Sequence, residues 1–178
     1  MDTSLRTHNA LEYFKWVEAF LSGETDTYRA IEKQLQKERF VLKRMTSLDE
    51  AKQYVKKVFQ GSNKTYGLVT SSKNRIVQQI PFSKPRDRIK PHVAYYNHPT
   101  SPYYCKNLQF AVTEFHSQGL ELDMVILVWG DDLIWGANGW DFNKYGLNRQ
   151  AENPIQMKLN AYRVLLTRGR DGVIIVKV

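Results

Sequence analysis

The feature that most constrains this fold is a pair of apolar runs separated by a dense polar insert. Residues 110–112 and 124–129 are apolar, and the insert between them spans residues 113–123. Short continuous apolar runs bounded by polar segments are typical of strands that are buried on both faces, as in parallel sheets. The stretch 112–128 therefore predicts a buried strand, a functional loop and a second buried strand.

A second stretch, residues 160–170, completes the pattern. An apolar helical run over residues 157–166 ends in Thr167-Arg168-Gly169-Arg170, and a strand-like run follows at residues 173–178. Two arginines at a helix-to-strand junction are well positioned to meet an anion, because a guanidinium offers several donors in one plane.

The rest of the chain alternates between helical and strand-like patterns. Helical periodicity at residues 5–21 and 25–37 predicts a helical lead-in, 1–38, ahead of an α/β core, 39–178. Strands are expected at residues 40–45, 66–70, 108–113, 124–129 and 173–178, and helices at residues 47–61 and 154–166, with Ser47 and Asn153 as N-caps. Residues 133–135 and 140–142 predict a β-hairpin with an Asn138-Gly139 turn. This order indicates one α/β domain with a mainly parallel sheet and a β-hairpin insertion.

Trp16 and Phe20 lie at helical spacing in the first predicted helix. Aromatic residues in such a stripe are more typical of a core than of an exposed stacking platform. We therefore expect both to contribute to the core.

Composition excludes several classes of protein. With 178 residues and 42% hydrophobic residues, the chain is long enough for one globular domain. The net charge is +8, and residues 1–90 hold all of the excess, with 18 basic and 10 acidic side chains. This asymmetry favours either a polyanion-facing side or solvated basic helix faces. The lone Cys105 excludes an internal disulfide. The sequence shows neither a signal peptide nor an apolar stretch of membrane-spanning length, and these observations together predict a soluble cytoplasmic protein.

Cationic side chains are dense between residues 73 and 90. They follow a run of hydroxyl side chains and are opposed only by Asp87. The six basic residues are Lys73, Arg75, Lys84, Arg86, Arg88 and Lys90. Contacts to a nucleic-acid backbone need such density, although a solvated loop explains it equally well. The nearby Tyr95, Tyr96, Tyr103 and Tyr104 either stack on bases or anchor a loop onto the sheet.

Catalytic motifs are sparse. No Gly-x-x-x-x-Gly-Lys-Ser/Thr phosphate loop occurs. Gly130-Asp131-Asp132 is either a pair of magnesium-binding acids or a charged turn that opens the hairpin. Glu114, Glu121 and Asp123 either form a nuclease-like cluster or make hydrogen bonds within their loop plus a single ligand contact. The histidines have no metal-ligand spacing with Cys105, so no metal site is predicted.

Two motifs together carry a family resemblance. The first is Thr113-Glu114-Phe115-His116-Ser117-Gln118-Gly119-Leu120-Glu121, and the second is Tyr162-Arg163-Val164-Leu165-Leu166-Thr167-Arg168. Together with residues 129–135, 5–8 and 16–21, they resemble the schlafen group-3-like DNA/RNA helicase family. Members of this family are superfamily 1 P-loop helicases. The resemblance implies a RecA-like three-layer sandwich that forms the second of two RecA-like domains in a motor.

The same resemblance implies roles for individual residues. The 113–123 segment is similar to helicase motif V, which implies nucleotide contacts from Gly119 and Glu121. Strand contact or coupling is implied for Thr113, Ser117 and Gln118. The 165–170 segment looks like motif VI, which implies that Arg168 is an arginine finger and that Arg170 lies beside the nucleotide. Arg75 is either the motif IV arginine or a surface arginine.

A first RecA-like domain, with its phosphate loop, magnesium-binding acid and catalytic base, is missing from the sequence. The resemblance therefore implies that ATP and Mg²⁺ bind only in a complete two-domain protein, in which that domain is supplied in cis or in trans. It further implies a DNA or RNA partner, expected to be single-stranded, and no ATPase activity of the chain alone. Two other interpretations stay open: a stand-alone nucleic-acid-binding module through residues 73–90, and a metal-dependent nuclease through Asp131.

Overall fold

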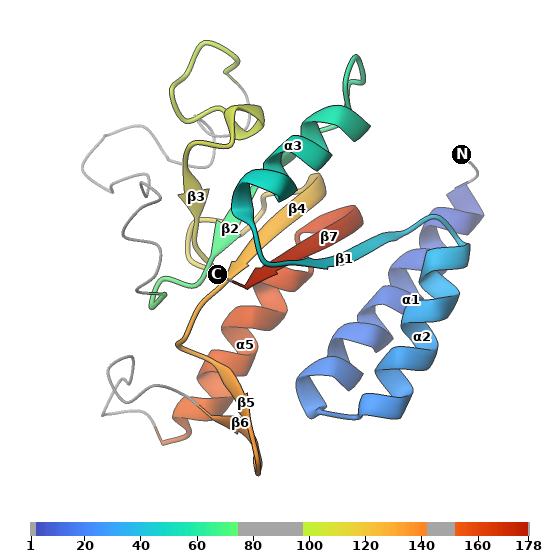
Figure 1. The fold of residues 1–178 in the computed structure, drawn as a ribbon, viewed down its shortest axis with the longest axis vertical. Helices are drawn as coiled ribbons and strands as arrows, with labels where there is room; N and C mark the ends of the chain where they lie inside the picture. Colours follow the sequence, from blue (N-terminus) through green and yellow to red (C-terminus); the bar gives the residue numbers. More distant parts are fainter. Residues whose placement is uncertain (1–2, 75–97, 142–151, 178) are drawn as a thin grey trace.

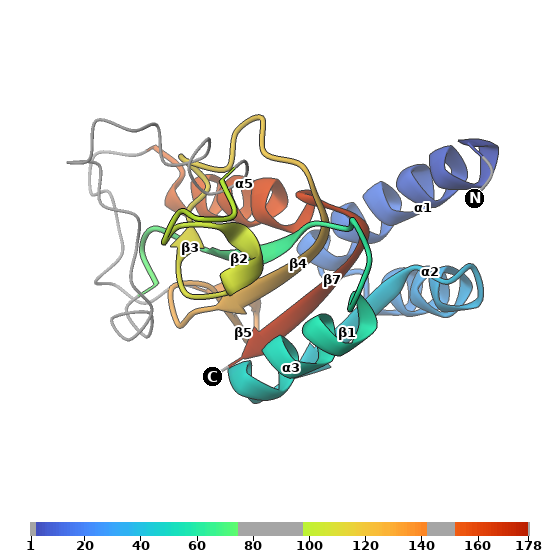
Figure 2. The ribbon, with the colours of Figure 1, turned by 90° about the horizontal axis from the view of Figure 1, so that it is seen from above.

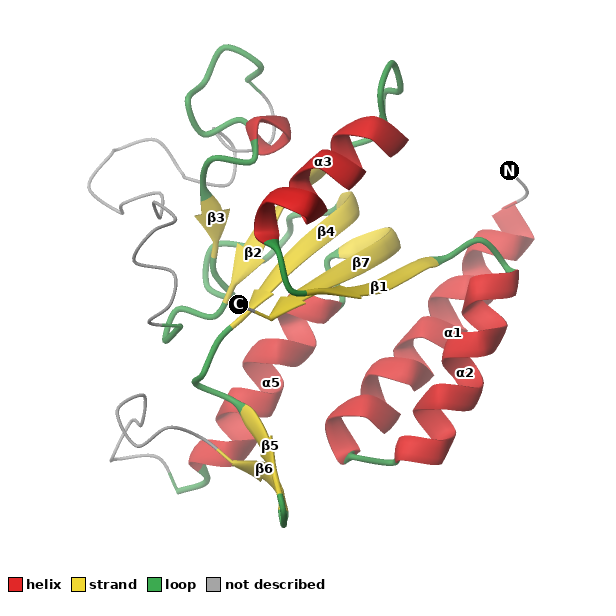
Figure 3. Cartoon of the chain, viewed as in Figure 1, coloured by secondary structure: helices red, strands yellow, loops and turns green. Residues whose placement is uncertain are grey.

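A computed structural model describes residues 3–74, 98–141 and 152–177, and its centre is a five-stranded parallel sheet (Figures 1 and 3). The strand order is β1-β7-β4-β2-β3. The strands are β1 (Val41–Met45), β2 (Tyr66–Thr70), β3 (Ala111–Val112), β4 (Leu122–Trp129) and β7 (Gly169–Lys177). All residues of β2 and β4 are buried, as expected for strands covered on both faces. The prediction of an α/β fold with a parallel sheet is confirmed.

Helices cover both faces of this sheet, which makes the fold a RecA-like three-layer sandwich. Helix α3 (Leu48–Val58) packs on one face, and α5 (Pro154–Leu166) packs on the other face together with α1 (Thr3–Ser22) and α2 (Thr25–Lys37) (Figure 2). The connections through α3 and α5 run in opposite directions along the sheet. Because each crossover between parallel strands is right-handed, opposite directions place the two helices on opposite faces.

Side chains alternate between two hydrophobic cores across the paired strands. Val125 of β4 lies beside Val173 of β7, in the core under α1, α2 and α5. The next pair, Ile126 and Ile174, belongs to the core under α3. A one-residue shift in this pairing would exchange the two cores, so the register is strongly specified.

The helical lead-in is part of the larger core. Trp16 is 0% exposed and stacks on Phe20 with ring centroids 4.9 Å apart. Phe20 is partly buried and packs on the same core. The expectation that these aromatic residues are core residues is confirmed.

The helices lie within three residues of their predicted bounds, with α3 ending at Val58 and not at residue 61, and the strands differ in four respects. Strand β3 is shorter than predicted because a 3₁₀ turn, Cys105–Asn107, precedes it and Leu108 has a left-handed φ of 53°. Strand β4 begins two residues earlier than predicted and β7 four residues earlier, at Gly169. The predicted hairpin exists as β5 (Ile134–Gly136) and β6 (Gly139–Asp141), but Gly139 pairs with Gly136, so the turn lies at residues 137–138. Among the described helices, none is both long and apolar enough to cross a membrane.

Candidate functional site

Arg168 lies between the end of α5 and the start of β7, at the amino end of the sheet. Its Nε donates a hydrogen bond to the carbonyl of Val164 at 3.0 Å, and its Nη1 donates to the carbonyl of Ser117 at 3.1 Å. Partial burial lowers the pKa of Arg168, while the nearby charge of Glu121 raises it. No described carboxylate lies within ion-pair distance of the guanidinium. Main-chain carbonyls therefore hold this cation in place without cancelling its charge.

The loop between β3 and β4 provides the second half of the site. Gly119 has a φ of +76°, a conformation that costs other residues about 1–2 kcal/mol. The turn is closed by a hydrogen bond from the Leu120 amide to the Ser117 carbonyl, 3.0 Å, which is the same carbonyl that receives Arg168. The Leu122 amide in turn donates to the carbonyl of Arg168 at 3.1 Å. The segments 117–122 and 168 are thus directly joined.

These residues border a cavity of about 290 Å³ that also involves α1. Its lining includes Arg168, Arg170 and Glu121, together with Tyr13 and Phe14 of α1. The Tyr13 hydroxyl donates to the carbonyl of Leu166 at 2.6 Å, which fixes α1 against the end of α5. Phe14 is 53% exposed, which is unusual for so large an apolar side chain. Tyr13 and Phe14 were not predicted as site residues, because they lie about 150 residues from Arg168 in the chain and no local pattern connects them.

Arg170 is held by carboxylates, unlike Arg168. Its Nη2 donates to Asp123 at 3.2 Å, and its Nη1 lies 3.8 Å from Glu121. Burial raises the pKa of Asp123, but hydrogen bonds from Thr65 and the charge of Lys64 outweigh burial and hold it below its usual value. Arg170 therefore belongs to an ion-pair network that fastens the amino ends of β2, β4 and β7.

Two of the other predicted contacts, Lys73 and Thr113, lie at the carboxyl end of the sheet, directly after β2 and β3. Lys73 is exposed just after β2, and the neighbouring Ser72 donates to Glu114 through its amide, 2.9 Å, and its hydroxyl, 2.6 Å. Thr113 is buried, with its hydroxyl 3.3 Å from Nδ1 of His116, whereas Gln118 is exposed. The predicted contacts Arg75, Lys84, Arg86, Arg88 and Lys90 lie outside the described residues.

The four tyrosines considered for base stacking all precede β3 in the chain, and the structure describes two of them. Tyr103 and Tyr104 are partly buried against the core, and Tyr103 packs on Phe110 with centroids 4.9 Å apart. For these two, the anchoring interpretation is confirmed. Tyr95 and Tyr96 lie outside the described residues.

The carboxylates proposed as metal ligands have other partners. Asp132 is 2% exposed and receives hydrogen bonds from Ser71 at 2.6 Å, Tyr162 at 2.6 Å and Lys158 at 2.7 Å. Glu114 binds Ser72 beyond one end of β2, whereas Asp123 binds Thr65 before the other end, so these carboxylates do not form one cluster. No group of three or more potential metal ligands is found among the described residues.

The fold and the site together define a class. A five-stranded parallel sheet covered by helices on both faces, with a braced arginine at the start of its last strand, is a RecA-like domain of the α/β class. The family model for the Schlafen group 3, DNA/RNA helicase domain matches residues 1–178, and the chain belongs to this family. No curated protein matches the chain significantly.

Proposed function

We propose that this chain is the second RecA-like domain of a nucleic-acid-dependent NTPase, and that Arg168 is its arginine finger. One observation carries the proposal: the guanidinium is oriented by two main-chain carbonyls, keeps its charge unpaired by any described carboxylate, and borders a cavity. An arginine finger needs this combination, since it must be fixed before the reaction and must still be able to stabilise negative charge.

The cavity fits part of a nucleotide site. Its volume, about 290 Å³, lies at the lower limit of ~300–1,000 Å³ that is typical of small-molecule sites. Nη2 of Arg168 has no acceptor among the described residues, so two N–H groups are available to a phosphoryl oxygen. Glu121 is 72% exposed on the same cavity, and we assign its carboxylate to the nucleotide, with Gly119 giving the loop its turn. Arg170 is already paired with Asp123 and Glu121, so we assign it to the support of Glu121 and to a peripheral contact with the nucleotide.

A complete site requires a second domain under this proposal. The described residues offer no carboxylate cluster for Mg²⁺, and the sequence holds no phosphate loop. We therefore assign the phosphate loop, the metal ligands and the catalytic base to a first RecA-like domain that packs on this cavity. ATP would supply the phosphoryl group, with Mg²⁺ bound mainly by that other domain.

The loop 113–121 gives a physical basis for coupling to nucleic acid. It begins at the carboxyl end of β3, beside the exposed Lys73 and the Ser72–Glu114 hydrogen bonds, and it reaches Arg168 through the Ser117 carbonyl. Ser117 is fully buried, which supports a role in coupling, and the exposed Gln118 and Lys73 are the better candidates for strand contact. Displacement of this loop by a bound strand would move the acceptor that orients Arg168.

ATP hydrolysis tests the proposal. We expect no turnover by the 178-residue chain alone and nucleic-acid-stimulated turnover when a phosphate-loop domain of the same family is joined to it or added. Arg168→Ala should then lower kcat by roughly 10³–10⁵-fold.

Arg163→Ala is the matched control, because Arg163 lies on α5, is 34% exposed and pairs with Glu18. It should leave kcat within a few-fold of the unchanged protein. Turnover by the isolated chain that Arg168→Ala abolishes would contradict the need for another domain.

A further inference from the structure

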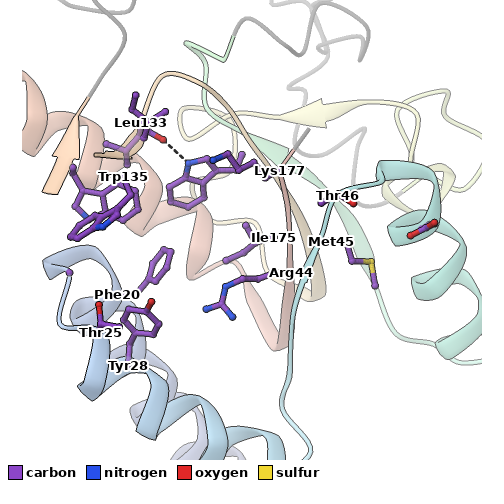
Figure 4. Close-up of a pocket in the computed structure, with 15 residues that line it drawn as sticks. Phe20, Thr25, Tyr28, Arg44, Met45, Thr46, Leu133, Trp135, Ile175 and Lys177 are labelled. Carbon is purple, nitrogen blue, oxygen red and sulfur yellow. Dashed lines mark hydrogen bonds between the residues drawn. The ribbon is translucent and has the colours of Figure 1, made fainter. Parts of the chain in front are cut away.

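A second and larger cavity, of about 660 Å³, lies at the opposite end of the sheet (Figure 4). Its floor is formed where three strands end, at Met45 of β1, Trp129 of β4 and Ile175 of β7. The carboxyl ends of parallel strands are where open α/β sheets bind ligands. The volume falls within the ~300–1,000 Å³ typical of small-molecule sites.

Aromatic rings form two walls of this cavity. Phe20 and Tyr28 project from the α1–α2 pair, with ring centroids 5.4 Å apart. Trp135 and Trp140 project from the hairpin, with centroids 5.0 Å apart, and Trp129 connects the walls. The rings offer both faces and edges to an incoming planar group.

The cavity is held open by direct contact between its two walls. Gly23, with a φ of +75°, forms the α1–α2 turn, and the ring of Trp135 occupies the space that a Cβ would fill there. The Nε1 of Trp129 donates to the carbonyl of Leu133 at 2.7 Å, which fixes the start of the hairpin on the sheet. Trp135 is nonetheless 54% exposed, so a large aromatic surface faces solvent in a fixed position.

Two cations border the cavity, and they differ in availability. Arg44 is bound by both oxygens of Glu32, at 2.6 and 2.9 Å, which cancels its charge. Lys177 is exposed and makes no ion pair with any other described residue. Glu50 also lines the cavity and offers a carboxylate to hydrogen-bond donors.

We propose that this aromatic cavity binds one unstacked base of a single-stranded nucleic acid, with the adjoining phosphate next to Lys177. Stacked aromatic side chains bind bases of any sequence through their π-faces, and a nearby lysine supplies the backbone contact. A nucleic acid is favoured over an apolar peptide because Lys177, beside the rings, has no described counter-ion and the chain belongs to a DNA/RNA helicase domain family. The site is separate from Arg168 and does not depend on the function proposed for it.

The test uses fluorescence anisotropy with two labelled single strands of equal length: one normal, the other abasic throughout. Trp135→Ala should weaken binding of the normal strand by about 5- to 150-fold, the range that stacking of one base supplies, and should leave the abasic strand unchanged. Trp135→Phe should retain most of the affinity, because it keeps an aromatic face. Leu11→Ala, which changes a side chain that is 58% exposed and borders neither cavity, should change neither affinity.

Three results would overturn the proposal: no loss of affinity in Trp135→Ala, an equal loss for both strands, or no binding of either strand by the unchanged protein. The melting temperature of each variant separates misfolding from lost contacts. If Trp135→Ala fails to fold, Lys177→Ala decides the matter. Lys177→Ala should weaken binding of both strands and reduce its salt dependence, and the absence of that effect would also contradict the proposal.

Discussion

Replacing Lys158 with methionine should destabilise the domain strongly. The ammonium of Lys158 is 2.7 Å from a carboxylate oxygen of Asp132, and the two side chains are only 8% and 2% exposed. Methionine has a similar length and no charge, so the substitution leaves a buried carboxylate without its counter-ion. Removing one partner of a buried ion pair costs about 3–5 kcal/mol.

The structure places the expected cost near the lower end of that range. Asp132 keeps hydrogen bonds from Ser71 and Tyr162, both at 2.6 Å, so its oxygens retain two donors. We expect a loss of about 3 kcal/mol in the free energy of unfolding, which corresponds to a fall of about 6–12 °C in Tm for a domain of this size. Adding Asp132→Asn should recover most of this loss, since the amide is neutral and can still pair with both hydroxyls.

Urea unfolding followed by tryptophan fluorescence measures these differences. Lys15→Met is the matched control, because Lys15 forms an equally short ion pair with Glu12, 2.7 Å, but is 66% exposed. It should cost less than about 1 kcal/mol. A loss in Lys158→Met as small as that in the control, or no recovery in the double variant, would refute the reasoning.

Three other measurements test local features of the structure. Asn153→Ala removes the N-cap that accepts from the Gln156 amide at 3.1 Å, and urea unfolding should show a loss of about 1 kcal/mol. The pKa of Asp123 is below its usual value despite burial, chiefly through the hydrogen bond from the Thr65 amide. The ionised carboxylate therefore stabilises the fold fully above the unfolded pKa of about 3.9, and this stabilisation is lost as pH falls through the folded pKa. Asp123→Asn should therefore lose less stability on acidification than the unchanged protein, as measured by urea unfolding at a series of pH values. Burial raises the pKa of Cys105 to about 11, so a thiol reagent at neutral pH should label it only after unfolding; rapid labelling of the folded protein would contradict this.

Local chemistry explains why much of the fold could be predicted. The N-caps Ser47 and Asn153 accept the expected amide hydrogen bonds from Glu50 and Gln156. These signals lie within three residues of the helix start and do not depend on the remainder of the fold. Continuous apolar runs likewise predicted β4 and β7 as buried strands, because a strand covered on both faces has no polar side to show.

The site was predictable only in part, because its contacts join distant segments. The resemblance pointed to both Arg168 and Glu121 as residues of the nucleotide site, and the structure brings both to one cavity. The contribution of Phe14 could not be inferred, since it depends on how α1 docks against α5. The Lys158–Asp132 pair was missed for the same reason, although a lysine within an apolar helical run was a signal for a buried partner.

The aromatic cavity shows a further limit of sequence patterns. Trp135 and Trp140 were predicted on a hairpin, and Phe20 was predicted in a core, but no pattern indicates that the three border one cavity. Their proximity depends on the α1–α2 turn at Gly23 meeting the hairpin. Such a meeting is set by tertiary packing, which local periodicity does not encode.

The central claim, that Arg168 stabilises charge developing on a transferred phosphoryl group, is tested most directly with a transition-state analogue. In the chain joined to a phosphate-loop domain of the same family, affinities for ADP with aluminium fluoride and for ADP alone would be measured by calorimetry. Arg168→Ala should weaken binding of the analogue by roughly 10³-fold or more and binding of ADP by less than about 10-fold, because an arginine finger acts chiefly in the transition state. Equal losses for both ligands, or no loss for the analogue, would contradict the account.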